Sequence, residues 1–148
     1  MTGEYTLHTI RSDQVVRAFA LLQHVTPSLT IDQWQSVVDG QRWHIVVATD
    51  TACYVRGLTV SSTGKHPVAG KLLDVPVLVV GSAVDDVNIA EHLFAEAKRR
   101  AIVSKCQFIR IWMPAPDVFE HLRDLAHYNK WDHGLMCRID IAPAADLT

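Results

Sequence analysis

The feature that most constrains the fold is a nearly continuous apolar run from Leu72 to Val80. The run is much shorter than the roughly 20 residues that span a bilayer, and it is typical of a strand buried on both faces. Pro76 lies inside the run and has no N–H to donate to a neighbouring strand. We therefore expect a central strand with a β-bulge, or with an unpaired side, at Pro76.

Further strands are predicted from short runs rich in β-branched and aromatic residues. They are Glu4–Ile10, Trp43–Ala48, Cys53–Val60, Gln107–Met113 and Leu135–Ile141. Residues 49–51 are expected to join the strands on either side of them as a hairpin. The segment Ser61–Gly70 is rich in Ser, Thr and Gly, and it is expected to be a loop.

Helices are predicted where apolar residues recur at helical spacing. They begin at Ser12, Thr30, Asp86 and Pro114 and end near Pro27, Gly40, Val103 and Ala126. The sharpest local signal is the capping-box spacing of Thr30 and Gln33. Leu29 and Trp34, which flank this pair, have the spacing of a hydrophobic staple. The order β-α-α-β-β-β-α-β-α-β predicts a single α/β domain over residues 1–148, with a mixed, mostly antiparallel sheet and helices on both faces.

Composition excludes several classes of partner and site. The 148 residues include 14 Lys and Arg and 16 Asp and Glu, so neither nucleic acid nor an anionic membrane is expected as a partner. Three widely spaced cysteines, Cys53, Cys106 and Cys137, predict reduced, buried thiols in a cytoplasmic protein. No signal peptide is expected, and none of the 8 histidines has metal-ligand spacing. Residues 142–148 are expected to form a loose tail.

The order of elements, with a long strand ending at Val80 and leading into a long helix, resembles the GNAT superfamily of acyl-CoA-dependent N-acetyltransferases over roughly residues 5–141. In that family a loop of the pattern Arg/Gln-x-x-Gly-x-Gly/Ala follows the strand, and its N–H groups bind the pyrophosphate of CoA. In this chain Asp85, Asn88 and Ala90 occupy the three pattern positions. The resemblance therefore implies acetyl-CoA as cosubstrate, with a degenerate pyrophosphate-binding loop.

The altered loop has consequences for charge. Carboxylates at Asp85 and Asp86 would each repel a diphosphate by an amount on the order of 1 kcal/mol in wet surroundings. The same acids suit the start of a helix, where they can cap N–H groups and complement the helix dipole. The loop therefore separates two hypotheses: a functional acetyltransferase, and a degenerate GNAT-fold protein without CoA binding that serves as a ligand-binding or protein-interaction module.

The resemblance also implies which residues bind the cosubstrate. The expected cofactor-binding residues are Leu78, Val79, Val80, Asp85, Asp86, Val87, Asn88, Ile89 and Ala90. The strand would bind the pantetheine arm through its backbone, and the amides of residues 86–90 would bind the pyrophosphate. Tyr128 would protonate the thiolate leaving group, since a phenol of pKa about 10 can donate to a thiolate of pKa about 8.5. The alternative for Tyr128 is a ring packed against the sheet.

The acceptor would be a small-molecule amine or a peptide amine that attacks the thioester directly. The residue that deprotonates it stays open, and the candidates are His44, Asp74, Glu91, His92 and Glu120. Ligands of open α/β sheets bind beyond the carboxyl ends of strands, so Trp112, Met113 and Pro114 are also expected near the cleft. An exposed final strand would allow a homodimer.

Overall fold

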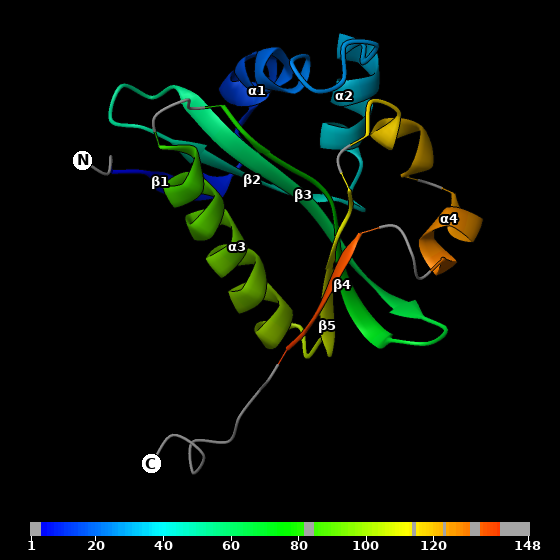
Figure 1. Ribbon diagram of the computed structural model, residues 1–148. Coiled ribbons are helices and arrows are strands. Elements are labelled where there is room, and N and C mark those ends of the chain that lie inside the picture. The colour runs from blue at the N-terminus through cyan, green and yellow to red at the C-terminus, as the bar shows by residue number, and fades with distance from the viewer. Residues whose placement is uncertain (1–3, 82–84, 114, 123, 131–133, 140–148) are drawn as a thin grey trace, which may run out of the picture.

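The computed structural model describes residues 4–81, 85–113, 115–122, 124–130 and 134–139, and it shows one sheet between two layers of helices (Figure 1). The strands are β1 (Thr6–Thr9), β2 (His44–Thr49), β3 (Val55–His66), β4 (Gly70–Val80), β5 (Phe108–Ile111) and β6 (Leu135–Arg138). They lie in chain order across the sheet, and the β4–β5 pair is parallel while the other four pairs are antiparallel. The predicted mixed, mostly antiparallel α/β fold is confirmed.

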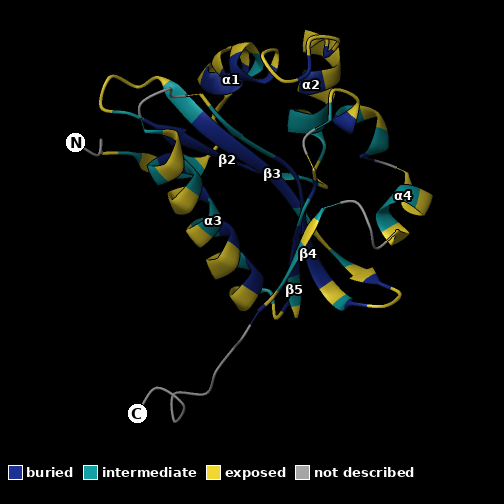
Figure 2. Ribbon diagram, in the orientation of Figure 1, coloured by how far each residue is buried: buried dark blue, intermediate teal, exposed yellow. Residues whose placement is uncertain are grey.

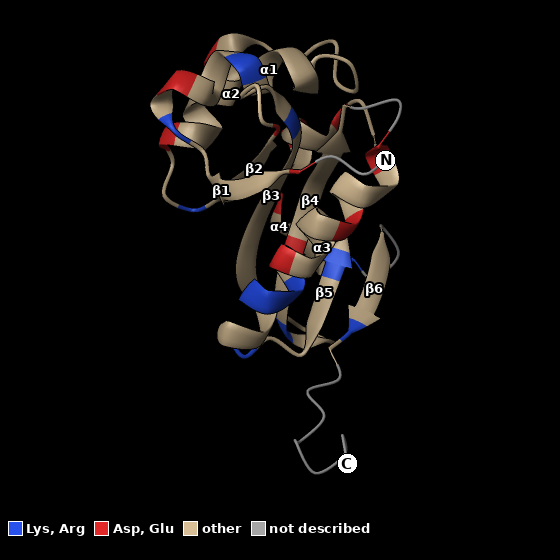
Figure 3. Cartoon of the chain, turned by 90° about the vertical axis from the view of Figure 1, so that its left-hand side faces the viewer, with Lys and Arg blue, Asp and Glu red and all other residues tan. Residues whose placement is uncertain are grey.

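The helices cover both faces of this sheet. They are η1 (Ser12–Gln14), α1 (Val15–Leu22), α2 (Ile31–Asp39), α3 (Asp86–Val103), η2 (Val118–His121) and α4 (Leu125–Asn129). The long helix α3 packs on one face, and α1, α2 and η2 pack on the other (Figure 1). Figure 2 shows the buried residues concentrated along β2, β3 and β4 between these layers, while exposed residues lie on the outer sides of the helices. Lys and Arg are interspersed with Asp and Glu in the view of Figure 3. Within the described residues, no helix has the length and apolar character needed to cross a bilayer.

The predicted capping box fixes the start of α2. Thr30 Oγ1 accepts the Gln33 N–H at 3.2 Å, and Gln33 Oε1 accepts the Thr30 N–H at 2.9 Å. Leu29 and Trp34, the predicted staple pair, are both buried in the same core cluster. Trp34 also donates its Nε1–H to the carbonyl of Val15 at 2.9 Å, which fastens α2 to α1.

One expectation about the middle of the chain is wrong. Ser61–Gly70 is not a loop, because β3 continues to His66 and β4 begins at Gly70. The imidazole of His66 closes the tight turn between them, where Nδ1 accepts the N–H groups of Val68 and Ala69 at 3.1 and 3.2 Å. These side-chain hydrogen bonds let a polar segment form a regular hairpin.

The cysteines also differ from expectation. Cys53 does not lie in a strand: it is exposed in the β2–β3 turn at a φ of 67°, and β3 begins only at Val55. Cys106 is buried just before β5, and Cys137 is half-buried in β6. All three thiols are free, but only Cys106 is buried, whereas the sequence predicted that all three would be.

The first and last predicted helices are shorter than expected. The first is a turn of η1 followed by α1, and Arg11 rather than Ser12 is the N-cap of η1. The last is divided into η2 and α4, because the side chain of Asp124 accepts the His127 N–H at 3.2 Å and starts a new helix. In the described part, β6 ends at Arg138; Pro114, residues 140–141 and the expected tail at 142–148 lie outside the described residues.

Candidate functional site

A bulge at Pro76 changes the direction in which β4 presents its side chains. Asp74 is paired with Ser62 and Val77 with Val60, so β4 has one more residue than β3 between these pairs. Before the bulge, Val75 packs against α3; after it, Val77 packs on the opposite face of the sheet. The predicted bulge is confirmed, and it reverses the alternation of side chains along β4.

Beyond the bulge, β4 pairs with no strand on the side of β5 among the described residues. The parallel pairing ends at Val75, whose carbonyl accepts the Trp112 N–H at 3.0 Å. From Pro76 onward the two strands diverge, and the chain after Trp112 turns toward η2 (Figure 1). The result is a strand that is paired on one edge and open on the other.

The register shows which backbone groups face the open edge. Gly81 donates its N–H to the carbonyl of Arg56 at 2.7 Å, so this pair is hydrogen-bonded across the β3–β4 ladder. Hydrogen-bonded and non-bonded pairs alternate along antiparallel strands, so Val79 faces β3 in the same way. The N–H and C=O groups of Leu78 and Val80 therefore point away from β3, toward the open edge.

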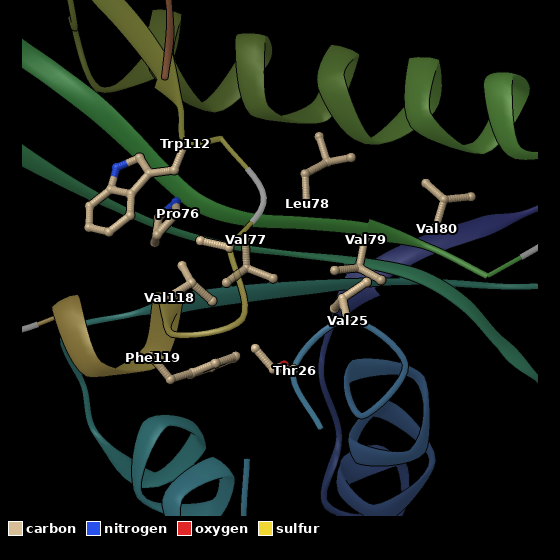
Figure 4. Close-up of a pocket in the computed structure, with 11 residues that line it drawn as sticks. Val25, Thr26, Pro76, Val77, Leu78, Val79, Val80, Trp112, Val118 and Phe119 are labelled. Carbon is tan, nitrogen blue, oxygen red and sulfur yellow. The ribbon is translucent and has the colours of Figure 1, made fainter. Parts of the chain in front are cut away.

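This open edge borders a pocket of ≈ 150 Å³ (Figure 4). The described residues that line it are Val25, Thr26, Pro76, Val77, Leu78, Val79, Val80, Trp112, Ala115, Val118 and Phe119. Val77 and Val79 point down toward the loop after α1, whereas Leu78 and Val80 point up toward α3. Trp112 lies in the cleft as predicted, Met113 lines an adjoining pocket, and Pro114 lies outside the described residues.

The helix α3 starts at Asp86, six residues after Val80, the last residue of β4. Asp85 is the N-cap of α3, yet its carboxylate makes no capping hydrogen bond. Instead it accepts the hydroxyl of Tyr5 at 2.7 Å and the side-chain amide of Asn88 at 3.3 Å. The hydrogen bond to Asp85 raises the pKa of the Tyr5 phenol. Asp86 Oδ1 accepts the N–H of Val87 at 2.9 Å, so Asp86 meets a backbone donor of this turn in the way that the sequence suggested.

The other residues proposed for this loop differ in exposure. Asp86 and Val87 are exposed, while Asn88 and Ala90 are half-buried. Ile89 is a fully buried residue of α3, and it packs in a cluster that includes Val80. The side chain of Ile89 thus serves the core, and only its backbone could face a ligand.

A buried ion pair lies next to the pocket. Arg110 (0% exposed) donates from Nε and Nη2 to the two oxygens of Asp74 (1% exposed) at 2.9 and 3.0 Å. Trp112 donates its Nε1–H to the same carboxylate at 2.6 Å, and Arg110 Nη1 donates to the carbonyl of Lys130 at 2.7 Å. These hydrogen bonds hold in place the indole of Trp112, which lines the pocket.

The candidates for a general base do not line the pocket on β4. The carboxylate of Asp74 already accepts three hydrogen bonds. The pKa of His44 is lowered by burial, and the charges that act on it belong to Glu96, Arg99 and Arg100 of α3. The remaining three also lie elsewhere: Glu91 and His92 are exposed on α3, and Glu120 lines a separate groove beside α2.

Tyr128 lies at a distance from the pocket along the sheet. Its hydroxyl lies against Gly64, which pairs with Leu72, four residues before Pro76. Arg110 sits over its ring at 5.0 Å, and its hydroxyl has no hydrogen-bond partner among the described residues. Burial raises the pKa of the Tyr128 phenol. The structure thus does not bring Tyr128 beside Leu78–Val80, and its role as general acid stays a prediction.

Two stacked imidazoles, His121 and His127, are not predicted by any pattern in the sequence. Their ring centroids lie 4.3 Å apart with an angle of 17° between the planes, and the His127 ring lies 4.8 Å from that of Trp112. The spacing of these residues matches no helical period, because they come from two elements, η2 and α4. The signal that could have found them is Asp124, a capping residue that breaks the predicted helix between them.

No protein-family model and no curated protein sequence matches the chain. Solved structures do. A GNAT-family N-acetyltransferase of Escherichia coli in complex with CoA matches with a TM-score of 0.67 at 14% identity, over 95% of this chain and 84% of that one. The aminoglycoside N-acetyltransferase AAC(6')-Iy in complex with CoA matches with a TM-score of 0.65 at 10% identity, over 97% and 96%.

A third match is a region of a fungal multi-domain GH3 β-N-acetylglucosaminidase described as a GCN5-related glucosamine N-acetyltransferase. Its TM-score is 0.64 at 13% identity, over 78% of this chain, which spans 14% of the length of that protein. The likeness to these structures extends over most of this chain, including its sheet and the long helix after β4. The chain has the fold of the GNAT superfamily of N-acetyltransferases.

Proposed function

We propose that the protein is an N-acetyltransferase that transfers the acetyl group of acetyl-CoA to an amine. The observation that carries this proposal is the open edge of β4, where the backbone groups of Leu78 and Val80 face a pocket beside Trp112. An edge with unpaired N–H and C=O groups binds an extended chain as an additional strand would. The pantetheine arm of CoA is such a chain, since its amide groups both donate and accept.

The pocket walls suit the remainder of that arm. Val77 and Val79 supply apolar surface on one side, and Val118 and Phe119 supply it on the other. Apolar walls with a few convergent backbone groups are typical of cosubstrate sites. Catalysis would consist mainly of positioning the thioester for direct attack by the amine, without a covalent intermediate on the protein.

The first turn of α3 would hold the pyrophosphate through the amides of residues 86–90. The contacts of Asp85 with Tyr5 and Asn88 support this, because they hold one carboxylate away from a capping position. The negative charges of Asp85 and Asp86 nevertheless oppose a diphosphate, which is what favours the second hypothesis, a module that no longer binds CoA.

Calorimetric titration with acetyl-CoA tests the proposal. Two proline variants compare the N–H groups at the open edge of β4 with those in the β3–β4 ladder. Leu78→Pro removes an N–H that faces the open edge, so we expect acetyl-CoA affinity to fall about three- to tenfold. It also removes a side chain that packs against both core clusters beneath α3, so it lowers the free energy of unfolding as well. Val79→Pro removes an N–H from the β3–β4 ladder and none from the open edge, so we expect it to lower the free energy of unfolding by about 1 kcal/mol or more. Failure of the unaltered protein to bind at millimolar acetyl-CoA would overturn the proposal in favour of an interaction module.

A second variant tests the charge of the loop. Asp85→Arg combined with Asn88→Gly removes one negative charge, adds one positive charge and opens space at the helix start. We expect CoA to bind about tenfold more tightly, which corresponds to about 1.4 kcal/mol. Pantetheine, which has no phosphate, is the matched control ligand and should bind both proteins equally. An unchanged affinity for CoA would contradict this account of the loop.

Two further expectations accompany the proposal. The three free thiols suit the reducing environment of the cytoplasm, where we place the reaction. The described part of the sheet ends at β6, and a homodimer through that edge stays a prediction.

A further inference from the structure

A second pocket adjoins the pocket on β4. Its volume is ≈ 260 Å³, and the described residues that line it are Trp112, Met113, Ala115, Asp117, Val118, His121 and His127. Trp112, Ala115 and Val118 line both pockets. The two pockets are therefore neighbours along these three residues.

Side-chain contacts hold the imidazoles of the second pocket in place. His121 donates from Nε2 to Asp117 at 3.1 Å, and its Nδ1 lies 3.8 Å from a carboxylate oxygen of Asp124. The ring of His127 is packed between those of His121 and Trp112. Trp112 is itself fixed by its hydrogen bond to the buried carboxylate of Asp74. Rigid partners on both faces therefore orient the His127 ring.

The surroundings of His127 favour its neutral form. Burial lowers the pKa of His127, and the charges of His121, Lys130 and Arg110 lower it further, against the opposing effect of Asp124. The carboxylate of Asp117 also lines this pocket, and it accepts a hydrogen bond from His121. A neutral imidazole near pH 7 can accept a proton.

We propose that this second pocket receives the acceptor, a compact and largely apolar primary amine, and that His127 takes the proton from its ammonium group. This inference rests on the proposed acetyltransferase function. The amine reaches the pocket protonated, and His127 removes one proton and later releases it to solvent. The free nitrogen attacks the thioester carbon, the C–N bond forms and the C–S bond breaks with its electron pair on sulfur. The second proton of the nitrogen is lost to the thiolate, so that an amide and a thiol result.

The lining of the pocket indicates the class of amine. Trp112, Met113, Ala115 and Val118 present apolar surface, whereas the polar groups gather at one side around His121 and Asp117. A phenylalkylamine would place its ring on the apolar wall and its nitrogen at the imidazoles. An amine rich in hydroxyl groups would leave them without partners against this wall, at a cost in binding.

The test uses acetyl-CoA as donor, phenethylamine as acceptor, and the variants His127→Gln and His24→Gln. His24 is an exposed residue beyond α1, so its replacement is the matched control. We expect His127→Gln to lower kcat/KM about 100-fold or more, and to abolish the rise of kcat/KM with pH below neutrality, because that rise reports deprotonation of the imidazole. Calorimetric affinity for acetyl-CoA should be unchanged in both variants, and His24→Gln should match the unaltered protein. An activity of His127→Gln within about threefold, with the same pH profile, would overturn the inference.

A binding measurement separates this inference from the proposed function. In the unaltered protein without acetyl-CoA, the ring protons of His127 are followed by NMR while phenethylamine is added. We expect a saturable shift of the His127 signals and none of the His24 signals. Absence of a shift, in a protein that binds acetyl-CoA, would refute the acceptor pocket and leave the acetyltransferase proposal standing. Failure to bind acetyl-CoA would instead refute that proposal, and the shift would then report the amine site alone.

Discussion

Replacement of Arg110 by alanine is expected to lower the free energy of unfolding by about 3–5 kcal/mol. The change would leave the carboxylate of Asp74 without its charged partner in a site that is almost fully closed to water. It would also leave the carbonyl of Lys130 without its donor and remove the cation over the Tyr128 ring. Urea unfolding followed by Trp fluorescence measures the loss.

A double variant distinguishes the unpaired charge from lost packing. Asp74→Leu combined with Arg110→Met removes both charges while keeping apolar volume, and it should lose markedly less stability than Arg110→Ala alone. Indole Nε1 of Trp112 and the Lys130 carbonyl lose partners in this variant, so we do not expect a full recovery. A loss below about 1 kcal/mol for Arg110→Ala would show that the pair contributes little.

Trp34→Ala is expected to have an effect of similar size, about 3–5 kcal/mol. Trp34 is 0% exposed, and it meets the ring of Phe119 edge to face at 6.1 Å. Trp34 therefore connects α2 to η2, whose residue Phe119 lines the pocket on β4. It also donates a hydrogen bond to the carbonyl of Val15. Since the wall depends on this contact, we expect acetyl-CoA affinity to fall together with stability.

Trp34→Phe is the matched control for that prediction. It keeps an aromatic ring in the core but removes the Nε1–H donor, so it should cost about 1–3 kcal/mol for the lost hydrogen bond to the Val15 carbonyl and for the smaller ring. Thermal unfolding monitored by circular dichroism measures both variants. Equal losses for the alanine and phenylalanine variants would show that the hydrogen bond, rather than ring packing, dominates at this site.

The parts of the fold that sequence could predict are those with strong local signals. The apolar run with Pro76 at its centre predicts a buried, bulged strand, and the spacing of Thr30 and Gln33 predicts the start of α2. The extension of β3 to His66 has no such signal, because polar and small residues there resemble a loop. Its stability comes from pairing with β4 and from the turn closed by His66, which are visible only in three dimensions.

The candidate site also has a part that could be predicted from the sequence and a part that could not. The strand end at Leu78–Val80 could be predicted because a family resemblance depends on the order of elements, which the sequence shows. The pair His121 and His127 could not, since its geometry arises where the chain breaks at Asp124 and folds back toward Trp112. Residues brought together by a change of direction leave no periodic pattern in the sequence.

The bulge at Pro76 sets the register of β4 beyond Asp74. If the same residues paired regularly from Asp74 onward, Leu78 rather than Val79 would lie opposite Leu58. Leu78 and Val80 would then turn their backbone groups toward β3, and Val79 would turn its side chain from the α1 face to the α3 face. Loss of the bulge without loss of a residue would thus alter the ligand-facing edge and the packing of both helix layers at once. Deletion of Pro76 itself would leave one residue between the flanking pairs on each strand, so the facing of Leu78 and Val80 would be kept.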